Sequence, residues 1–164
     1  METYVVPEGW SERLTMVISG TVSEFEGRVR GVPVVRFAID CQPWSGFLTL
    51  ALLTAEEAEA DPLLLDPAEM AAWRNYGFPD GLTSWCQAQG LGREMQDSYT
   101  AASEKEVMAD AFFSACALAV ARAEAAGSLG LLDRDGRFQI SVTHPDDGRE
   151  FYPPGAEAGN KRLE

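Results

Sequence analysis

The segment between Ser103 and Gly127 constrains the fold more than any other part of the chain. Its middle reads AFFSACALAVA at 111–121 and is apolar on every side except for one serine, which is typical of a helix that other elements cover all round. Ser103 and Glu106 have capping-box spacing, and Gly127 follows at a position that favours a left-handed backbone. The sequence therefore predicts a long buried helix over about 103–126.

Upstream of this helix, a helical pattern is followed by two β-rich runs. Apolar residues recur with a 3.6-residue period from Trp10 to Val29. This predicts an amphipathic helix, with a strand as the alternative because Gly20 and several β-branched residues weaken the pattern. The runs at 34–41 and 47–54 flank a turn that contains Pro and Gly, and this arrangement predicts a hairpin.

Two shorter helix starts follow the hairpin. Thr54 and Glu57 form a second capping-box pattern, in which the hydroxyl accepts a backbone N–H and the carboxylate reaches back to the N–H of Thr54. Asp66 precedes a proline, as at the first turn of a helix. The stretch 79–102 shows no clean period, so we predict a loop there with one helical turn near 82–89.

The last regular element is a strand, because apolar and polar residues alternate through Phe138, Ile140 and Val142. Together the elements predict the α+β fold class: a single domain over 1–152, in which a small, mainly antiparallel sheet packs against the long helix and one or two further helices. The tail 153–164 has almost no apolar residue to anchor it, and we expect it to be mobile.

The chain is strongly acidic. Its 13 Lys and Arg against 26 Asp and Glu give a net charge of −13 with the one His neutral, and the pI is about 4.4. Because nucleic acid and anionic lipid are bound mainly through Lys and Arg, we expect neither as a partner. The charge favours a basic protein partner and speeds encounter with it at low salt, although acidity can also serve solubility alone.

The cysteines and the N-terminus indicate the compartment. Cys41, Cys86 and Cys116 are an odd number at wide spacing without a CxxC, which is typical of reduced thiols. The N-terminus lacks the basic and apolar runs of a signal peptide. The longest apolar helical run is only 11 residues, whereas about 20 are needed to span a bilayer. We therefore expect a cytoplasmic protein with no membrane association.

The densest acidic stretch is the candidate surface for partner binding. Six acids and no base lie between Thr54 and Met70, with a solvated face as the alternative explanation. The aromatic and Arg residues just downstream are of types enriched at interface hot spots, whereas we assign Met70 and Trp73 to packing. The predicted contact residues are Glu56, Glu57, Glu59, Arg74, Tyr76 and Phe78.

The alternative to binding is catalysis by a cysteine and the only histidine. A Cys/His hydrolase would use Cys41 or Cys86 as the nucleophile and His144 as the base, and it would need a lowered thiol pKa. Cys41 lies in DCQPWSGF, which resembles, with an interruption, the DCSGF stretch that carries the nucleophile in some bacterial cysteine peptidases. His144 lies in THPDDG, whose Pro, Asp and Gly also describe a turn. The sequence has no zinc set, calcium loop or phosphate loop, so we expect no metal and no cofactor.

Several short motifs follow one another in a characteristic order. They are Leu53-Thr54, Pro67-Ala68-Glu69 with Trp73 and Tyr76-Gly77, Leu129-Gly130-Leu131, and the final strand with its acids, Ile140 to Asp147. In this order, over about residues 10–148, the chain resembles the bacterial domain-of-unknown-function 4303 family, although the Trp falls later after the Pro than in the family pattern.

The resemblance implies a small bacterial domain with no assigned catalytic residues, similar in size and context to immunity partners of secreted toxins. Such a protein needs tight, steered binding and no chemistry. We therefore predict a non-catalytic, acidic protein-binding domain of the immunity or antitoxin type, with a basic toxin or another basic protein as its partner. A Cys/His hydrolase is the first alternative, and a structural subunit of a larger assembly is the second.

Overall fold

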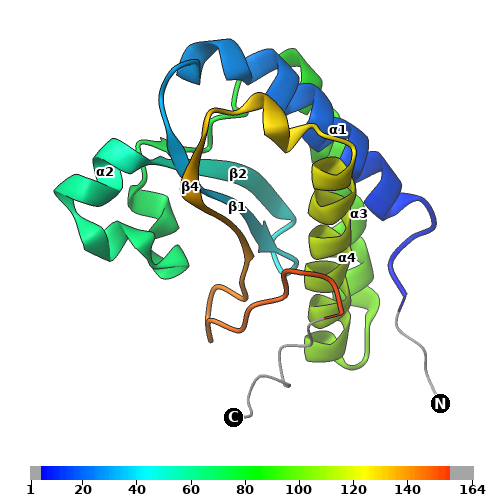
Figure 1. Ribbon diagram of the computed structural model, residues 1–164. Helices are drawn as coiled ribbons and strands as arrows, with labels where there is room; N and C mark the ends of the chain where they lie inside the picture. Colours follow the sequence, from blue (N-terminus) through cyan, green and yellow to red (C-terminus); the bar gives the residue numbers. More distant parts are fainter. Residues whose placement is uncertain (1–4, 156–164) are drawn as a thin grey trace.

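Four strands form one sheet in the order β3-β2-β1-β4 in the computed structural model, which describes residues 5–155 (Figure 1). β1 (Val34–Gln42) and β2 (Phe47–Thr54) pair antiparallel around the predicted turn, and the short β3 (Asn75–Tyr76) adds antiparallel to β2. β4 (Arg134–Val142) runs parallel to β1. The predicted α+β fold with a small, mainly antiparallel sheet is confirmed, with one parallel strand at an edge.

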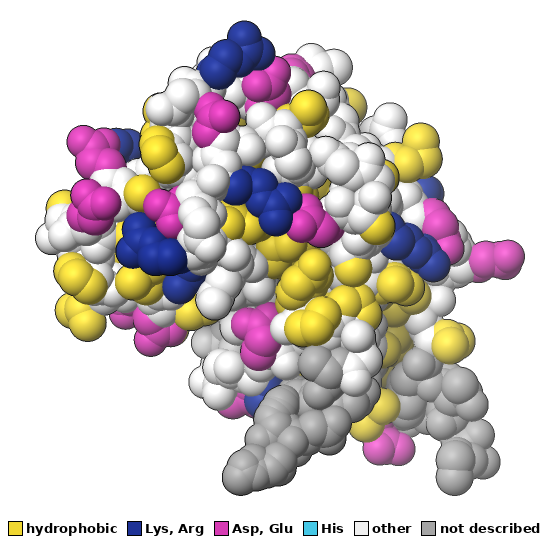
Figure 2. Space-filling model, in the orientation of Figure 1, with side chains coloured by type: hydrophobic (Ala, Val, Ile, Leu, Met, Phe, Trp, Pro, Cys, Tyr) yellow, Lys and Arg dark blue, Asp and Glu magenta, His cyan; other side chains and the backbone are white. Residues whose placement is uncertain are grey.

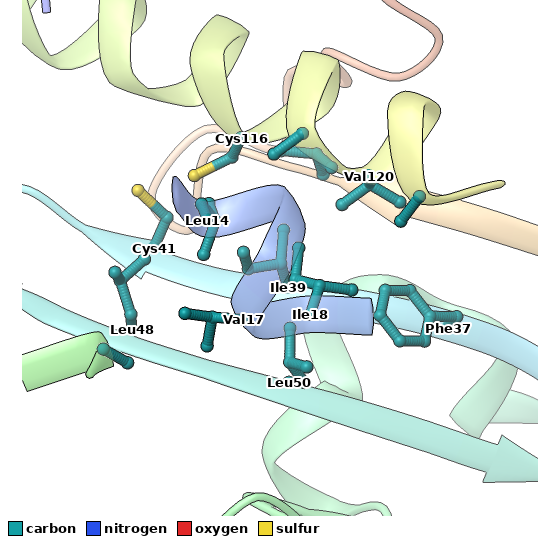
Figure 3. Packing of buried hydrophobic residues seen from close by; sticks show 14 of the residues in the cluster. Leu14, Val17, Ile18, Phe37, Ile39, Cys41, Leu48, Leu50, Cys116 and Val120 are labelled. Atoms are coloured by element: carbon teal, nitrogen blue, oxygen red, sulfur yellow. The ribbon is translucent and has the colours of Figure 1, made fainter. Parts of the chain in front are cut away.

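Three helices cover one face of the sheet: α1 (Trp10–Phe25), α3 (Ala88–Ala101) and α4 (Lys105–Ala125) (Figure 1). The periodic apolar residues of α1 all point into the resulting core, so the helical interpretation is confirmed over the strand. The Trp10 indole N–H donates to the Leu91 carbonyl at 3.0 Å and thereby joins α1 to α3. Figure 3 shows the packing of this core, which includes Leu14, Ile18, Phe37, Ile39, Leu50, Cys41, Cys116 and Val120.

The long helix α4 is buried as predicted, with Ser114 and Leu118 as the exposed positions of its middle turns. It begins at Lys105, and Glu104 rather than Ser103 is its N-cap residue. At the other end, Gly127 has a φ of +87°, the left-handed conformation expected after a helix.

The opposite face of the sheet is covered by a small lobe of short helices, which we call the acidic lobe and define as residues 55–72. It comprises α2 (Ala55–Ala60) and two 3-10 helices, Pro62–Leu65 and Pro67–Ala72. The Thr54–Glu57 capping box is present at the start of α2. Asp66 caps the second 3-10 helix through the N–H of Ala68, whereas the sequence predicted an α-helix there.

The acidic lobe covers the apolar half of this second face. Met70 and Trp73 are buried against Val35, Ala38, Ala51 and Leu53, as predicted from their helical spacing. Because side chains alternate along a strand, Asp40 and Gln42 lie on the same face as Ala38. The second face therefore ends in polar side chains, at the end of β1 next to its turn.

The prediction of a loop over 79–102 is wrong for most of its length, because residues 88–101 form α3. Gly90 and Gly92 lower the helix propensity of this stretch. Gly92 nevertheless has a packing reason: a Cβ there would overlap the carbonyl oxygen of Gly46 in the β1–β2 turn. Gly92 thus lowers helix propensity but allows α3 to pack closely against the sheet.

No helix within residues 5–155 is long and apolar enough to cross a bilayer. Most of the predicted mobile tail, 156–164, lies outside the described residues, so its mobility stays a prediction.

Candidate functional site

The acids of the predicted partner-binding stretch fall on the acidic lobe, where most of them are exposed. The Glu56 side chain is 78% exposed and lies 3.5 Å from the Arg74 guanidinium. Glu59 and Glu69 are also at the surface. These side chains are therefore exposed, and their contact with a partner stays a prediction.

Glu57 is an exception, and its assignment as a partner contact is wrong. The residue is only 6% exposed. One carboxylate oxygen accepts from the backbone N–H and the hydroxyl of Thr54, at 3.2 and 2.9 Å, and the other accepts from the N–H of Arg74 at 2.7 Å. Both carboxylate oxygens are thus used by hydrogen bonds within the protein, which connect the start of α2 to the segment after the lobe.

The three predicted contact residues downstream of the lobe differ in their burial and in their contacts. Phe78 is buried against Phe25, with ring centroids 4.5 Å apart, so its assignment to a partner surface is also wrong. Arg74 is exposed. Tyr76 is half-buried, and its hydroxyl donates to Asp40 at 2.6 Å. Of the three, only Tyr76 contacts the polar end of the sheet, through its hydrogen bond to Asp40.

A cleft opens at this polar end, between the acidic lobe and the loop 143–150 that follows β4. Asp40 and Gln42 of β1 line it, together with the 3-10 helix after Asp66 on one side and the loop on the other. Its volume is about 610 Å³, in the usual range for ligand sites. We call it the acidic cleft because its lining carboxylates are Asp40, Asp66, Asp146, Asp147 and Glu150, and no Lys or Arg among residues 5–155 lines it.

Asp40 is the most buried of these carboxylates, with 9% of its surface exposed. It accepts from the Tyr76 hydroxyl and, at 3.2 Å, from the side-chain amide of Gln42. Burial, and then the hydrogen bond to Asp40, raise the pKa of Tyr76, so the phenol remains a donor. None of the ion pairs between described residues includes Asp40.

The loop beside the cleft is a turn, as its Pro, Asp and Gly residues predicted. Gly148 has a φ of +77°, and its N–H donates to the carbonyl of His144 at 2.9 Å. The guanidinium of Arg149 donates to both carboxylate oxygens of Asp110 on α4 at 3.0 Å, and to Asp147 at 2.9 Å. These bonds raise the pKa of Arg149. The one cation of the loop is therefore bound to α4 and to Asp147.

Glu150 is the last residue of the loop. One of its oxygens accepts from the backbone N–H groups of Val142 and Tyr152, at 2.7 and 3.0 Å. Burial raises the pKa of Glu150, and the backbone hydrogen bonds act in the opposite direction. Like Asp40, this carboxylate lies in the cleft with neutral donors around it.

His144 is buried in the loop between aromatic rings. Its ring centroid is 4.9 Å from Phe113 and 5.9 Å from Trp44. Nδ1 accepts from the N–H of Asp146 at 3.1 Å, which assigns the proton of the neutral ring to Nε2. Nε2 lies 3.8 Å from a Glu106 carboxylate oxygen and has no hydrogen-bond partner within the described part of the chain.

The environment of Cys41 is the opposite of what a nucleophile needs. Its side chain lies in the core on the helical face of the sheet, and its thiol contacts the Met95 sulfur at 3.5 Å. Figure 3 shows the sulfur atoms of Cys41 and Cys116 pointing toward one another between β1 and α4. Burial raises the pKa of the Cys41 thiol. The assignment of Cys41 as a catalytic residue is therefore wrong, because a buried, protonated thiol does not attack a substrate.

Thiol labelling tests this assignment. Cys86 is exposed, whereas Cys41 and Cys116 are buried. We expect native protein to react quickly with one equivalent of Ellman's reagent per chain, and unfolded protein to react with all three thiols. The Cys86→Ser variant should then show no fast native labelling. Fast labelling of Cys41 in that variant would restore it as a candidate nucleophile.

The sequence interpretation missed Asp40, Gln42 and Glu150 as members of one site. The signal for the first two was available, since an Asp and a Gln in the strand VVRFAIDCQ occupy the face opposite to Ile39 and Cys41. The position of Glu150 beside them depends on the parallel pairing of β4 with β1, which local pattern does not reveal. Within residues 5–155, no three acidic, Cys or His side chains converge closely enough to hold a metal ion.

Comparison with known proteins adds no assignment to this geometry. No family model, no curated protein and no solved structure matches the chain. The resemblance to the domain-of-unknown-function 4303 family stays a prediction.

Proposed function

We propose that this protein is a non-catalytic binding domain that holds a basic protein partner against the acidic lobe and the acidic cleft. Neutralisation of a basic toxin, in the manner of an immunity protein, is the concrete form of this function. The observation that carries the proposal is the lining of the cleft, which has five carboxylates and, among the described residues, no Lys or Arg.

Electrostatics support a basic partner. A cleft lined by charges of one sign concentrates the field at its mouth and raises the rate at which an oppositely charged partner arrives. The net charge of −13 adds a long-range attraction of the same sign. Association governed by these charges should weaken steeply as salt is added.

The acidic lobe offers apolar contact next to these charges. Leu63 is 76% exposed on the 3-10 helix Pro62–Leu65. Figure 2 shows hydrophobic, acidic and basic side chains side by side over the region of α2. An apolar contact surrounded by charges is the arrangement of many protein interfaces. A basic partner with an apolar patch therefore fits the lobe and the cleft together.

Affinity capture from a lysate of the protein's own host tests the proposal. Wild-type protein should retain a basic protein in near-equal amount at low salt and release it at high salt. Neutralising three exposed lobe acids (Glu56→Gln, Glu59→Gln, Glu69→Gln) should lower the affinity for the partner about fivefold to a hundredfold, and reduce the amount retained accordingly, because each removes an attraction of a few tenths to 1 kcal/mol.

The matched control neutralises three acids outside the lobe and the cleft: Glu8→Gln, Asp80→Asn and Asp97→Asn. It has the same net charge as the lobe variant and should retain most of the partner. Equal losses in the two variants would show that total charge, and not this surface, governs binding. Capture of no basic protein by the wild type would contradict the proposed function itself.

A further inference from the structure

We infer that the loop 143–150 is a pH-sensitive switch, in which protonation of His144 exchanges a hydrogen bond inside the turn for ion pairs with Asp147 and Glu106. The inference goes beyond the proposed function and does not depend on it, because it concerns the protein without a partner. Residues of this loop form one side of the acidic cleft, so that side changes shape when the histidine is charged.

The neutral ring of His144 is part of the turn. Its Nδ1 accepts from the N–H of Asp146 at 3.1 Å. The backbone of the same residue is bonded to Arg149 and to Gly148, at 2.9 Å in each case. His144 is only 4% exposed, so little water reaches the ring to replace the bond at Nδ1. The turn therefore requires a lone pair on this nitrogen.

Protonation removes that lone pair. In the charged imidazolium both ring nitrogens are donors, so Nδ1–H and the N–H of Asp146 face one another on nitrogen atoms 3.1 Å apart. The hydrogen bond is lost, and the two donors repel each other. The buried charge also needs a partner, because removing a charge from water is costly. The loop therefore cannot keep its neutral-state geometry around the charged ring.

Two carboxylates lie next to the ring, just beyond hydrogen-bond distance. Nε2 lies 3.8 Å from an oxygen of Glu106, and Nδ1 lies 3.8 Å from an oxygen of Asp147. The Glu106 side chain is 80% exposed, so it can rotate at little cost in packing. A movement of about 1 Å brings each carboxylate to the distance of a charge-assisted hydrogen bond. The loop thus has one set of hydrogen bonds for the neutral ring and another for the charged ring.

The other charged groups around the ring leave these two carboxylates as its partners. The guanidinium of Arg149 is bound to Asp110 on α4 and to Asp147. The ammonium of Lys105, at the start of α4, donates to carbonyls at the end of α3. The β1–β2 turn contributes the uncharged ring of Trp44. The remaining acids on this side line the acidic cleft: Asp40, Asp146 and Glu150. The surrounding negative charges offset part of the cost of burying the imidazolium.

A pH titration followed by NMR tests the inference, and it is simple to interpret because the chain has a single histidine. We expect the ring signals of His144 to titrate between about pH 8 and pH 5, with ring nitrogen shifts that assign the neutral proton to Nε2. The backbone amides of 143–150 should move with the same midpoint, most of all that of Asp146. The amides of β1 and β2 should stay constant.

Three variants separate the histidine from nearby carboxylates, which also titrate on acidification. His144→Asn replaces Nδ1 by an oxygen that can accept from Asp146 but cannot become charged, so the loop amides should lose the transition. Glu106→Gln removes one acceptor of the charged ring, and the midpoint should move to lower pH by a few tenths of a pH unit. The matched control is Asp97→Asn, an exposed acid on α3, which should leave the midpoint unchanged.

Several results would overturn the inference: no titration of the ring above about pH 5, a titrating ring with loop amides that do not follow it, or a neutral proton on Nδ1. Persistence of the loop transition in a folded His144→Asn variant would also overturn it. If that variant fails to fold, the comparison of Glu106→Gln with Asp97→Asn decides, because equal midpoints in the two would exclude the ion pair with Glu106.

Discussion

Replacing Glu57 by lysine should lower the free energy of unfolding by about 3 kcal/mol, because the change breaks a buried hydrogen-bond network and leaves a buried cation in its place. The carboxylate accepts from two N–H groups and one hydroxyl in the native protein. Urea unfolding followed by circular dichroism measures the effect. As one of the partner contacts predicted from the sequence, Glu57 would instead be expected to affect partner binding and not stability.

The neighbouring substitution Glu56→Lys provides the control. Glu56 has the same charge and lies on the same short helix, but its side chain is 78% exposed. We expect its unfolding free energy to change by less than about 0.5 kcal/mol, as for most surface positions. Equal stability of the two variants would mean that the Glu57 network does not form in solution.

Replacing Phe113 by alanine should cost about 4 kcal/mol of stability, since it empties a fully buried aromatic site. Phe113 lies on α4, and its ring packs against His144, at 4.9 Å between centroids, and against Phe151, at 5.2 Å. The loop beside the acidic cleft therefore depends on this ring for its position. Hydrogen exchange should accelerate at residues 143–151 more than in the β1–β2 hairpin.

The control for Phe113 is Val107→Ala, on the first turn of the same helix. Val107 is 45% exposed, and its truncation should change stability by less than about 1 kcal/mol. A similar small effect for Phe113→Ala, with unchanged exchange in the loop, would contradict the packing of the loop on α4.

Periodicity and capping predicted the main elements because these signals are local. The apolar stripe from Trp10 to Val29 and the all-apolar middle of α4 both predict burial, and in the structure both pack into the core against the sheet. The helix α3 was missed for a reason that is not local. Gly92 lowers helix propensity, and its benefit is visible only when Gly46 is placed against it.

In the acidic stretch, the capping-box prediction for Glu57 is correct, and it is incompatible with the assignment of Glu57 as a partner contact. The Thr54–Glu57 capping box was recognised from spacing and is present. A carboxylate that caps a helix and also accepts from Arg74 is not available to a partner. The count of acidic residues in this stretch does not distinguish exposed from buried carboxylates. Glu57 was therefore assigned to the surface, whereas its hydrogen bonds hold it inside the fold.

The acidic cleft could not be predicted as a unit, because its members come from three distant segments. Asp40 lies on β1, Asp66 opens the last helix of the lobe, and Asp146 follows β4. The parallel pairing of β4 with β1 brings the third segment to the first. A long-range pairing of this kind leaves no periodic signal in one sequence.

The most direct test of the account is an NMR footprint of the captured basic partner on the isotopically labelled protein. We predict that amide shifts and line broadening concentrate at 40–42, 55–72 and 143–150, and that added salt reverses them. A footprint on the exposed sides of α1, α3 and α4, with the acidic lobe and the acidic cleft unchanged, would contradict the assignment of this surface to partner binding.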